Sequence, residues 1–207
     1  MSLIRDAERL GLIDTVGQWV LEEAVRQCKE WKLDQLPGFF LDVNFSPLQI
    51  SDETLAKKVL RILKKHAFPG SCLCMEITES MEHMFSAHNQ MIIQTLRNHD
   101  ISVALDDFGV GYSSFQRLKD MPVGILKTER QFVQNIEDDS YLLNPFHTMV
   151  ELAHVADKQL IAEGVETQGQ RKLVKKNGAD YIQGYFFSQP LTAAELTKEL
   201  HRFYEHE

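Results

Sequence analysis

The sequence is most informative at Ser102-Val-Ala-Leu-Asp-Asp-Phe-Gly109, where a short apolar run leads into two adjacent carboxylates. The apolar residues do not alternate with polar ones, which is typical of a strand that is covered on both faces. The glycine that follows the aspartates indicates that the strand turns into a loop there. This stretch therefore predicts a buried strand with acidic side chains at its carboxyl end.

The same arrangement recurs along the chain, and every such run ends in a polar or charged residue. The runs are Phe39–Asn44, Cys72–Glu76, Ser102–Asp107, Val123–Lys127, Gln159–Glu163 and Tyr181–Gln183. Segments with helical periodicity lie between them, namely Asp52–Lys65, His88–Asn98, Tyr141–Asp157 and Gln168–Asn177, the last closed by Gly178. Strands that alternate with helices at this spacing predict βαβ units and a parallel sheet.

Six such repeats fit either an open doubly wound sheet or most of a (β/α)8 barrel. The ends of the runs favour the barrel, because the carboxyl ends of barrel strands all face one mouth. These ends carry groups that bind a metal, a phosphate or a proton: Asn44, Glu76, Asp106 with Asp107, Lys127, Glu163 and Gln183. Helix capping explains Asp or Asn at such places, but Glu, Lys and Gln are poor caps. We therefore expect an α/β fold of the TIM-like barrel type with about six of its eight strands.

A site built from these side chains offers oxygen ligands without histidine or cysteine, which suits Mg²⁺ or Mn²⁺ better than Zn²⁺ or copper. Converging carboxylates repel one another unless cations are present. Two metal ions bridged by an aspartate form a clamp for phosphodiester hydrolysis, because they activate water and stabilise the attacking and leaving oxygens. Lys127 would face the phosphate or the attacking water as a fixed positive charge. The residues alone thus predict a two-metal phosphoester hydrolase.

The composition indicates one globular domain over residues 1–207 and excludes other classes. Apolar residues make up 43% and charged residues 25% of the chain, which are globular values. No apolar run approaches the roughly 20 residues that span a bilayer, and no export leader opens the chain, so a cytoplasmic location is expected. The net charge of −8 argues against general binding to DNA or anionic lipid.

Near the N-terminus, apolar residues at spacings of three and four from Val16 to Trp31 predict an amphipathic helix that buries Trp19 and Trp31. The cysteines are too few for a disulfide framework and are expected to be small buried apolar residues: Cys28, Cys72 and Cys74.

The motifs at the strand ends follow the order typical of EAL domains, and the chain resembles these bacterial phosphodiesterases, which cut cyclic di-GMP to the linear dinucleotide pGpG. The matching motifs are Asn44-Phe-Ser-Pro47, Glu76-Ile-Thr-Glu79, Asp106-Asp-Phe-Gly109 with Gly111-Tyr-Ser-Ser114, Leu126-Lys127, Glu163-Gly-Val-Glu-Thr167 and Gln183-Gly-Tyr185. The resemblance extends from Ala7 to Pro190. It implies a signalling enzyme that requires Mg²⁺ or Mn²⁺.

The resemblance implies roles for individual residues. The metal ligands would be Asn44, Glu76, Asp106, Asp107 and Glu163. Within that set Asp106 is the expected bridge, and Glu163 is either a ligand of the second metal or the general base. Lys127 matches the catalytic lysine that holds the nucleophilic water or the phosphate, and Gln183 would order water or substrate. Glu79 would anchor the loop Asp107–Ser114, which in such proteins couples dimer contacts to metal binding.

Three departures from the family pattern are present. The Glu-Ala-Leu strand is absent, so these 207 residues are expected to bind at least one metal poorly and to show little turnover. Two explanations stay open: a chain shortened during cloning, with Met1-Ser2-Leu3 as a remnant, which is favoured, or a natural loss of catalysis. Thr128-Glu129 replaces an apolar residue and an aspartate after the lysine, and Val110 replaces a common threonine. These two changes are expected only to tune activity.

The resemblance suggests cyclic di-GMP as a partner, and an upstream sensor or diguanylate cyclase domain in the parent protein. For the helix Tyr141–Asp157, which carries Leu143, Phe146, Val150 and Leu152, two alternatives stay open: packing within the domain, or contact with a second copy of the chain in a homodimer. The alternative to an enzyme is a non-catalytic cyclic di-GMP receptor or protein-interaction module of EAL type. The retained ligand set favours the enzyme, since a degenerate receptor would usually have lost some of it.

Overall fold

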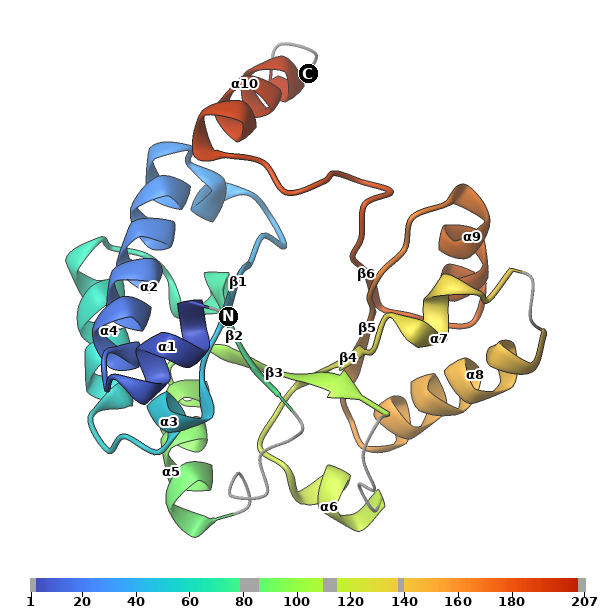
Figure 1. The fold of residues 1–207 in the computed structure, drawn as a ribbon, viewed down its shortest axis with the longest axis horizontal. Coiled ribbons are helices and arrows are strands. Elements are labelled where there is room, and N and C mark those ends of the chain that lie inside the picture. Colours follow the sequence, from blue (N-terminus) through green and yellow to red (C-terminus); the bar gives the residue numbers. More distant parts are fainter. Residues whose placement is uncertain (1–2, 79–85, 110–114, 138–139, 205–207) are drawn as a thin grey trace. The chain divides into compact units, whose positions relative to one another are not determined.

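The computed structural model describes residues 3–78, 86–109, 115–137 and 140–204 (Figure 1). Its strands follow one another across a sheet in chain order. They are β1 Leu41–Asn44, β2 Leu73–Thr78, β3 Ser102–Phe108, β4 Ile125–Thr128, β5 Gln159–Ala162 and β6 Tyr181–Ile182. β1 pairs with β2 in parallel, and so do β3 to β6 in turn. Each predicted run overlaps one of these strands, which confirms the parallel α/β architecture.

Helices connect the strands. They are α1 Leu3–Arg9, α2 Ile13–Glu30, α3 Pro47–Ile50, α4 Leu55–Lys65, α5 Ala87–Arg97, α6 Phe115–Asp120, α7 Gln131–Gln134, α8 Ser140–Val155, α9 Gln168–Lys176 and α10 Ala193–Tyr204, with the 3-10 turns η1 Leu33–Gln35 and η2 Gly70–Cys72. The predicted helical segments correspond to α2, α4, α5, α8 and α9. Within the part of the chain that the structure describes, no helix combines the length and the apolar character needed to cross a membrane.

The chain divides into two compact units. The first contains Met1–Glu76, Ser86–Ser102 and Pro190–Glu207, and the second contains Ile77–Phe85 and Val103–Gln189. The first unit therefore holds β1 and most of β2, whereas β4 to β6 and all of β3 except Ser102 belong to the second.

The core of the first unit forms where α2 packs against β1 and α4. The inward face of α2 carries Leu21, Val25 and Cys28, which recur at spacings of four and three and are at most 5% exposed. The prediction that this helix buries two indoles is wrong for Trp19, which is 67% exposed. Trp19 lies two residues before Leu21, about 200° around the helix at 3.6 residues per turn, and so faces away from the core.

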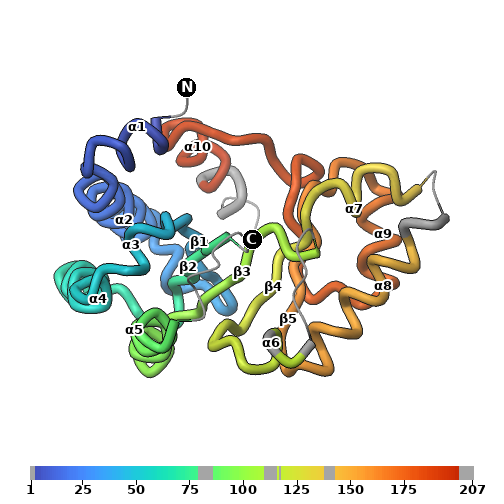
Figure 2. Tube along the Cα trace, turned by 60° about the horizontal axis from the view of Figure 1, so that its bottom comes forward, coloured from blue at the N-terminus to red at the C-terminus, as the bar shows by residue number. Residues whose placement is uncertain are grey.

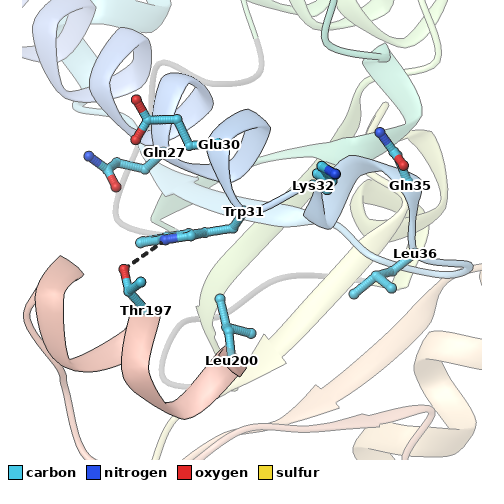
Figure 3. Close-up of a pocket in the computed structure, with 8 residues that line it drawn as sticks. All are labelled: Gln27, Glu30, Trp31, Lys32, Gln35, Leu36, Thr197 and Leu200. Carbon is cyan, nitrogen blue, oxygen red and sulfur yellow. Dashed lines mark hydrogen bonds between the residues drawn. The ribbon is translucent and has the colours of Figure 1, made fainter. Parts of the chain in front are cut away.

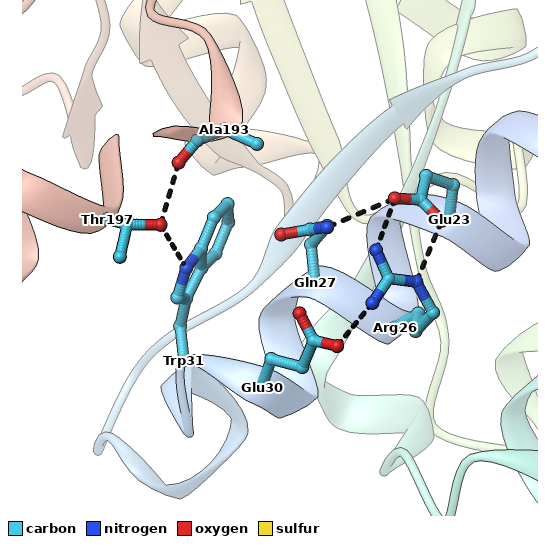
Figure 4. Close-up of polar contacts among 7 residues, drawn as sticks. All are labelled: Glu23, Arg26, Gln27, Glu30, Trp31, Ala193 and Thr197. Carbon is cyan, nitrogen blue, oxygen red and sulfur yellow. Dashed lines mark hydrogen bonds and ion pairs between the residues drawn. The ribbon is translucent and has the colours of Figure 1, made fainter. Parts of the chain in front are cut away.

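The second indole joins α2 to α10. Trp31 is partly buried, and its Nε1 donates to Thr197 Oγ1 at 2.9 Å. The same hydroxyl donates to the carbonyl of Ala193 at 2.8 Å, so one side chain connects the indole to the helix backbone (Figure 4). Trp31 is therefore held by a polar contact at the end of α2 rather than by full burial.

The core of the second unit lies on β4 and β5, with α8 and α9 packed beside β5 and β6 (Figure 2). Leu126 and Leu160 are fully buried, as expected for strands that are covered on both faces. The inward face of α8 carries Phe146, Val150 and Ala153, at a spacing of four and then three residues, and each is at most 3% exposed. This packing fixes the ends of β4 and β5, where predicted site residues lie.

Candidate functional site

β3 carries a β-bulge at its adjacent aspartates. Between Leu105 and Phe108 the register against β4 shifts, so Asp106 and Asp107 together stand opposite the single residue Lys127. A bulge interrupts the alternation of side chains along a strand and turns them in new directions. In a regular strand, Asp106 and Asp107 would point to opposite faces of the sheet. The bulge makes the backbone irregular here, so this alternation does not hold.

Asp107 adopts an uncommon backbone conformation within this bulge. Its φ of +57° lies in the left-handed region, which Gly, Asn and Asp tolerate better than other residues. Two residues later Gly109 has φ +105°, and a Cβ atom there would lie 2.8 Å from the sulfur of Met149. The chain thus leaves β3 through a sharp turn, with Asp107 exposed and Asp106 partly buried.

The predicted residues Asp106, Lys127 and Glu163 come together in the second unit. Lys127 Nζ lies 2.6 Å from Glu163 Oε1, and the two side chains are only 1% and 13% exposed. One carboxylate oxygen of Asp106 lies within 4.8 Å of one of Glu163. Asp106 Oδ1 is buried and, among the described residues, meets no hydrogen-bond partner. This cluster contains two acidic groups and one buried lysine at the ends of neighbouring strands.

The backbone of Glu163 has a partner of its own. Its amide donates to Thr128 Oγ1 at 3.2 Å, and Thr128 is fully buried. From the sequence, Thr128 was only a departure from the family pattern, and its contact with Glu163 was not predicted. The one signal in the sequence is its position directly after Lys127, where a β-branched polar residue ends the strand.

The loop after Glu163 is fixed by Gln170 on α9. Gln170 Oε1 accepts from the amides of Glu166 at 2.7 Å and Thr167 at 3.0 Å. Its Nε2 donates to the carbonyl of Gln134 at 2.9 Å. This buried amide therefore ties the loop to the end of α7.

Gln183 reaches the same end of β5 through its main chain. Its amide donates to the carbonyl of Ala162 at 2.9 Å, and its carbonyl accepts from the amide of Val165 at 3.1 Å. The residue is exposed. At the next position a Cβ on Gly184 would lie 2.1 Å from the carbonyl oxygen of Val165, so only glycine fits there.

Asn44 and Glu76 are neighbours in the first unit. They are register partners at the ends of β1 and β2, and the amide of Phe45 donates to the carbonyl of Glu76 at 2.8 Å. Asn44 is exposed and Glu76 is 5% exposed. The predicted loop anchor Glu79 and the loop residues 110–114 lie outside the described residues.

A cavity of about 760 Å³ lies elsewhere in the first unit, between the end of α2, η1 and α10. Its lining includes Trp31, Leu36 and Leu200, with the carboxylate of Glu30 at its edge (Figure 3). None of the predicted site residues contributes to it. The chemistry that the sequence predicts therefore belongs to the strand ends and not to this cavity.

Comparison with known proteins agrees with the fold and the motifs. The family model for the EAL domain matches residues 1–190. The chain is 33% identical to the bifunctional diguanylate cyclase/cyclic di-GMP phosphodiesterase MucR of Pseudomonas aeruginosa, over 92% of the chain and 28% of MucR. It is 30% identical to the cyclic di-GMP phosphodiesterase PdeR of Escherichia coli, over 98% of the chain and 31% of PdeR. It thus spans about three tenths of these relatives.

The fold has a close counterpart among solved structures. The structure of the PaMucR phosphodiesterase in complex with c-di-GMP superposes with a TM-score of 0.85 at 32% identity, covering 94% of this chain and 78% of the other. The chain is therefore an α/β protein with an incomplete TIM-like barrel, of which the described residues supply six strands. It belongs to the EAL domain family.

Proposed function

We propose that this domain hydrolyses cyclic di-GMP to linear pGpG by a two-metal mechanism. The observation that carries the proposal is the cluster of Asp106, Lys127 and Glu163, in which a buried lysine pairs with one of two adjacent carboxylates. The names of MucR and PdeR, which describe both as cyclic di-GMP phosphodiesterases, supply the substrate.

The donor atoms of the cluster fit a hard divalent cation. The two carboxylates lie within 4.8 Å of each other, and Asp106 Oδ1 is buried without a hydrogen-bond partner among the described residues. An orphaned buried carboxylate oxygen is costly in a protein interior unless a positive charge satisfies it. Oxygen donors of this kind suit Mg²⁺ or Mn²⁺. When bound, such ions stabilise the charge on the attacking and leaving oxygens.

The ligand set that we propose extends beyond the cluster. Its members are Asn44, Glu76, Asp106, Asp107 and Glu163. Gln183 lies at the neighbouring strand end, where it would contact substrate. Glu79 would anchor the loop that follows Asp107.

Lys127 and Glu163 would carry the proton chemistry. The ammonium group of Lys127 lies 2.6 Å from the Glu163 carboxylate and holds that carboxylate in place. An ionised carboxylate next to the scissile phosphate can accept the proton of the attacking water. Because Lys127 is fully buried, its charge acts in a medium with little screening by solvent.

Hydrolysis is tested with purified protein, Mn²⁺ and cyclic di-GMP, and the products are separated by chromatography. The assay uses residues 1–207 and, in parallel, the same residues preceded by a Glu-Ala-Leu strand. We expect pGpG from the extended protein and little turnover from residues 1–207. In the extended protein, Glu163→Gln should lose about 10²-fold or more, the size typical of removing a general base. Asp106→Asn tests the metal ligand in the same way.

Binding of cyclic di-GMP without any product in the extended protein would refute the enzymatic proposal and support the receptor alternative. Unchanged turnover in both Glu163→Gln and Asp106→Asn would show that the cluster is not the site. Circular dichroism of each variant establishes that it is folded.

A further inference from the structure

We infer that Thr128 is a positioning residue that fixes the main chain of Glu163 and, through it, the carboxylate of the proposed site. The inference rests on the proposed function, because Glu163 matters only if its carboxylate takes part in metal binding or proton transfer. Thr128 itself touches no reacting atom in this scheme.

The contact lies beyond the regular ladder between β4 and β5. The paired residues of the two strands end at Lys127 and Ile161. Thr128 and Glu163 follow these pairs, and the Thr128 hydroxyl accepts the Glu163 amide at 3.2 Å. Thr128 has no exposed surface, so water does not compete for this amide from the threonine side. A side chain thus extends the ladder by one step, up to the residue that carries the chemistry.

Adjacent residues of β4 hold Glu163 at both ends. Lys127 contacts its carboxylate at 2.6 Å and Thr128 contacts its amide at 3.2 Å. With the amide held, the backbone of Glu163 is restrained, and its side-chain torsions then place the carboxylate near that of Asp106.

The chain turns immediately after Glu163. Gly164 has φ +77°, and a Cβ atom there would lie 2.9 Å from Cγ of Arg130. The bond from Thr128 is therefore the last contact to β4 before a turn that only glycine makes without strain. Without that bond, the turn can begin one residue earlier, and the carboxylate of Glu163 moves with it.

The test compares Thr128→Val, which keeps the shape and removes the hydroxyl, with Thr128→Ser, which keeps the hydroxyl and removes the methyl group. The Kd for Mn²⁺ is measured by calorimetry on residues 1–207, and exchange of the Glu163 amide by NMR. For the valine variant we expect a Kd raised about tenfold, the lower end of the effect of groups that orient metal ligands, and faster amide exchange. In the serine variant, the Kd for Mn²⁺ and the exchange rate of the Glu163 amide are both expected to lie close to the wild-type values.

Thr148→Val is the matched control, because the Thr148 hydroxyl donates to the carbonyl of Asn144 on the exposed side of α8. It should change neither readout. If the valine variant does not fold, Thr128→Cys removes the strong acceptor at similar volume and should weaken Mn²⁺ binding in the same direction.

A folded Thr128→Val protein with wild-type Kd and wild-type Glu163 exchange would overturn the inference. A serine variant as weak as the valine variant would also overturn it, since packing and not the hydroxyl would then matter. Failure of the proposed function looks different: wild type and Glu163→Gln would then bind Mn²⁺ equally, while exchange of the Glu163 amide would still report whether Thr128 holds it.

Discussion

Replacing Lys127 by methionine tests the cluster most directly. Methionine has nearly the length of lysine without its charge, so the change removes the cation and leaves the surrounding volume filled. Glu163 then loses the ammonium group that lies 2.6 Å from its carboxylate, while the Asp106 carboxylate stays within 4.8 Å. We expect the metal-free protein to be destabilised because a buried charge is left uncompensated.

The size of the effect follows from the cost of breaking a buried ion pair. Removing one partner of such a pair costs about 3–5 kcal/mol, because the other charge is left buried without its counter-charge. The free energy of unfolding of Lys127→Met should therefore fall by about 3–5 kcal/mol at pH 7. The double variant with Glu163→Gln should recover more than half of that loss.

The assay is urea unfolding with EDTA present, followed by circular dichroism. Lys158→Met is the matched control, because Lys158 is also a buried lysine, but its Nζ donates to the carbonyls of Met121 and Val123 at 2.9 Å. The losses of unfolding free energy in Lys158→Met and in Glu163→Gln are expected to add up in the double variant. A loss under about 1 kcal/mol for Lys127→Met, or a double variant with no recovery, would refute the reasoning, since a buried pair was expected to cost far more.

The remaining predictions concern three other places. Gly184→Ala should lower the free energy of unfolding by more than about 3 kcal/mol, because the new Cβ would lie 2.1 Å from the Val165 carbonyl oxygen. Chemical denaturation measures this loss. Burial raises the pKa of the Cys28 thiol to about 11, so iodoacetamide should label it at pH 8.5 only after unfolding, and stability should fall as the pH rises from about 8.5 towards 11. Thr197→Val should lower stability by about 1 kcal/mol and change Trp31 fluorescence, because the indole loses its acceptor.

Each of these has a control and a result that would contradict it. Gly124→Ala should be nearly neutral, since nothing lies within 4 Å of its Cβ position; equal losses at Gly124 and Gly184 would disprove the steric argument. Rapid labelling of Cys28 in the folded protein would show that the thiol is accessible. Thr148→Val controls for loss of a helical hydroxyl, and a Thr197→Val protein with unaltered fluorescence would mean that the indole bond is absent in solution.

Sequence patterns predicted the strands well, because each predicted run is short, mostly apolar and ends in a polar residue. That logic also brought Asp106, Lys127 and Glu163 to one place, since the carboxyl ends of neighbouring parallel strands meet at one edge. Helix periodicity was less decisive at Trp19, because an apolar side chain at an acceptable spacing does not reveal which face is buried. The packing of α2 against β1 and α4 decides which face is buried, and Trp19 lies on the other face.

Two features of the site were beyond the reach of sequence patterns. The bulge at Asp106 and Asp107 depends on how β3 pairs with β4, and register is a property of two strands together. The acceptor role of Thr128 depends on the same kind of pairing, between β4 and the residue after β5. In both cases a contact over more than 20 residues of sequence separation determines what a single side chain does.

The left-handed backbone at Asp107 has a consequence for how this position can evolve. If every amino acid is tried at this position, the folded variants should be mainly those with aspartate, asparagine or glycine. The reason is that other residues tolerate the left-handed backbone conformation poorly. Aspartate and asparagine codons differ by one base, so a single mutational step removes the negative charge and preserves the turn. At position 107, Asp107→Asn is thus the change that removes a proposed metal ligand while it keeps the turn that ends β3.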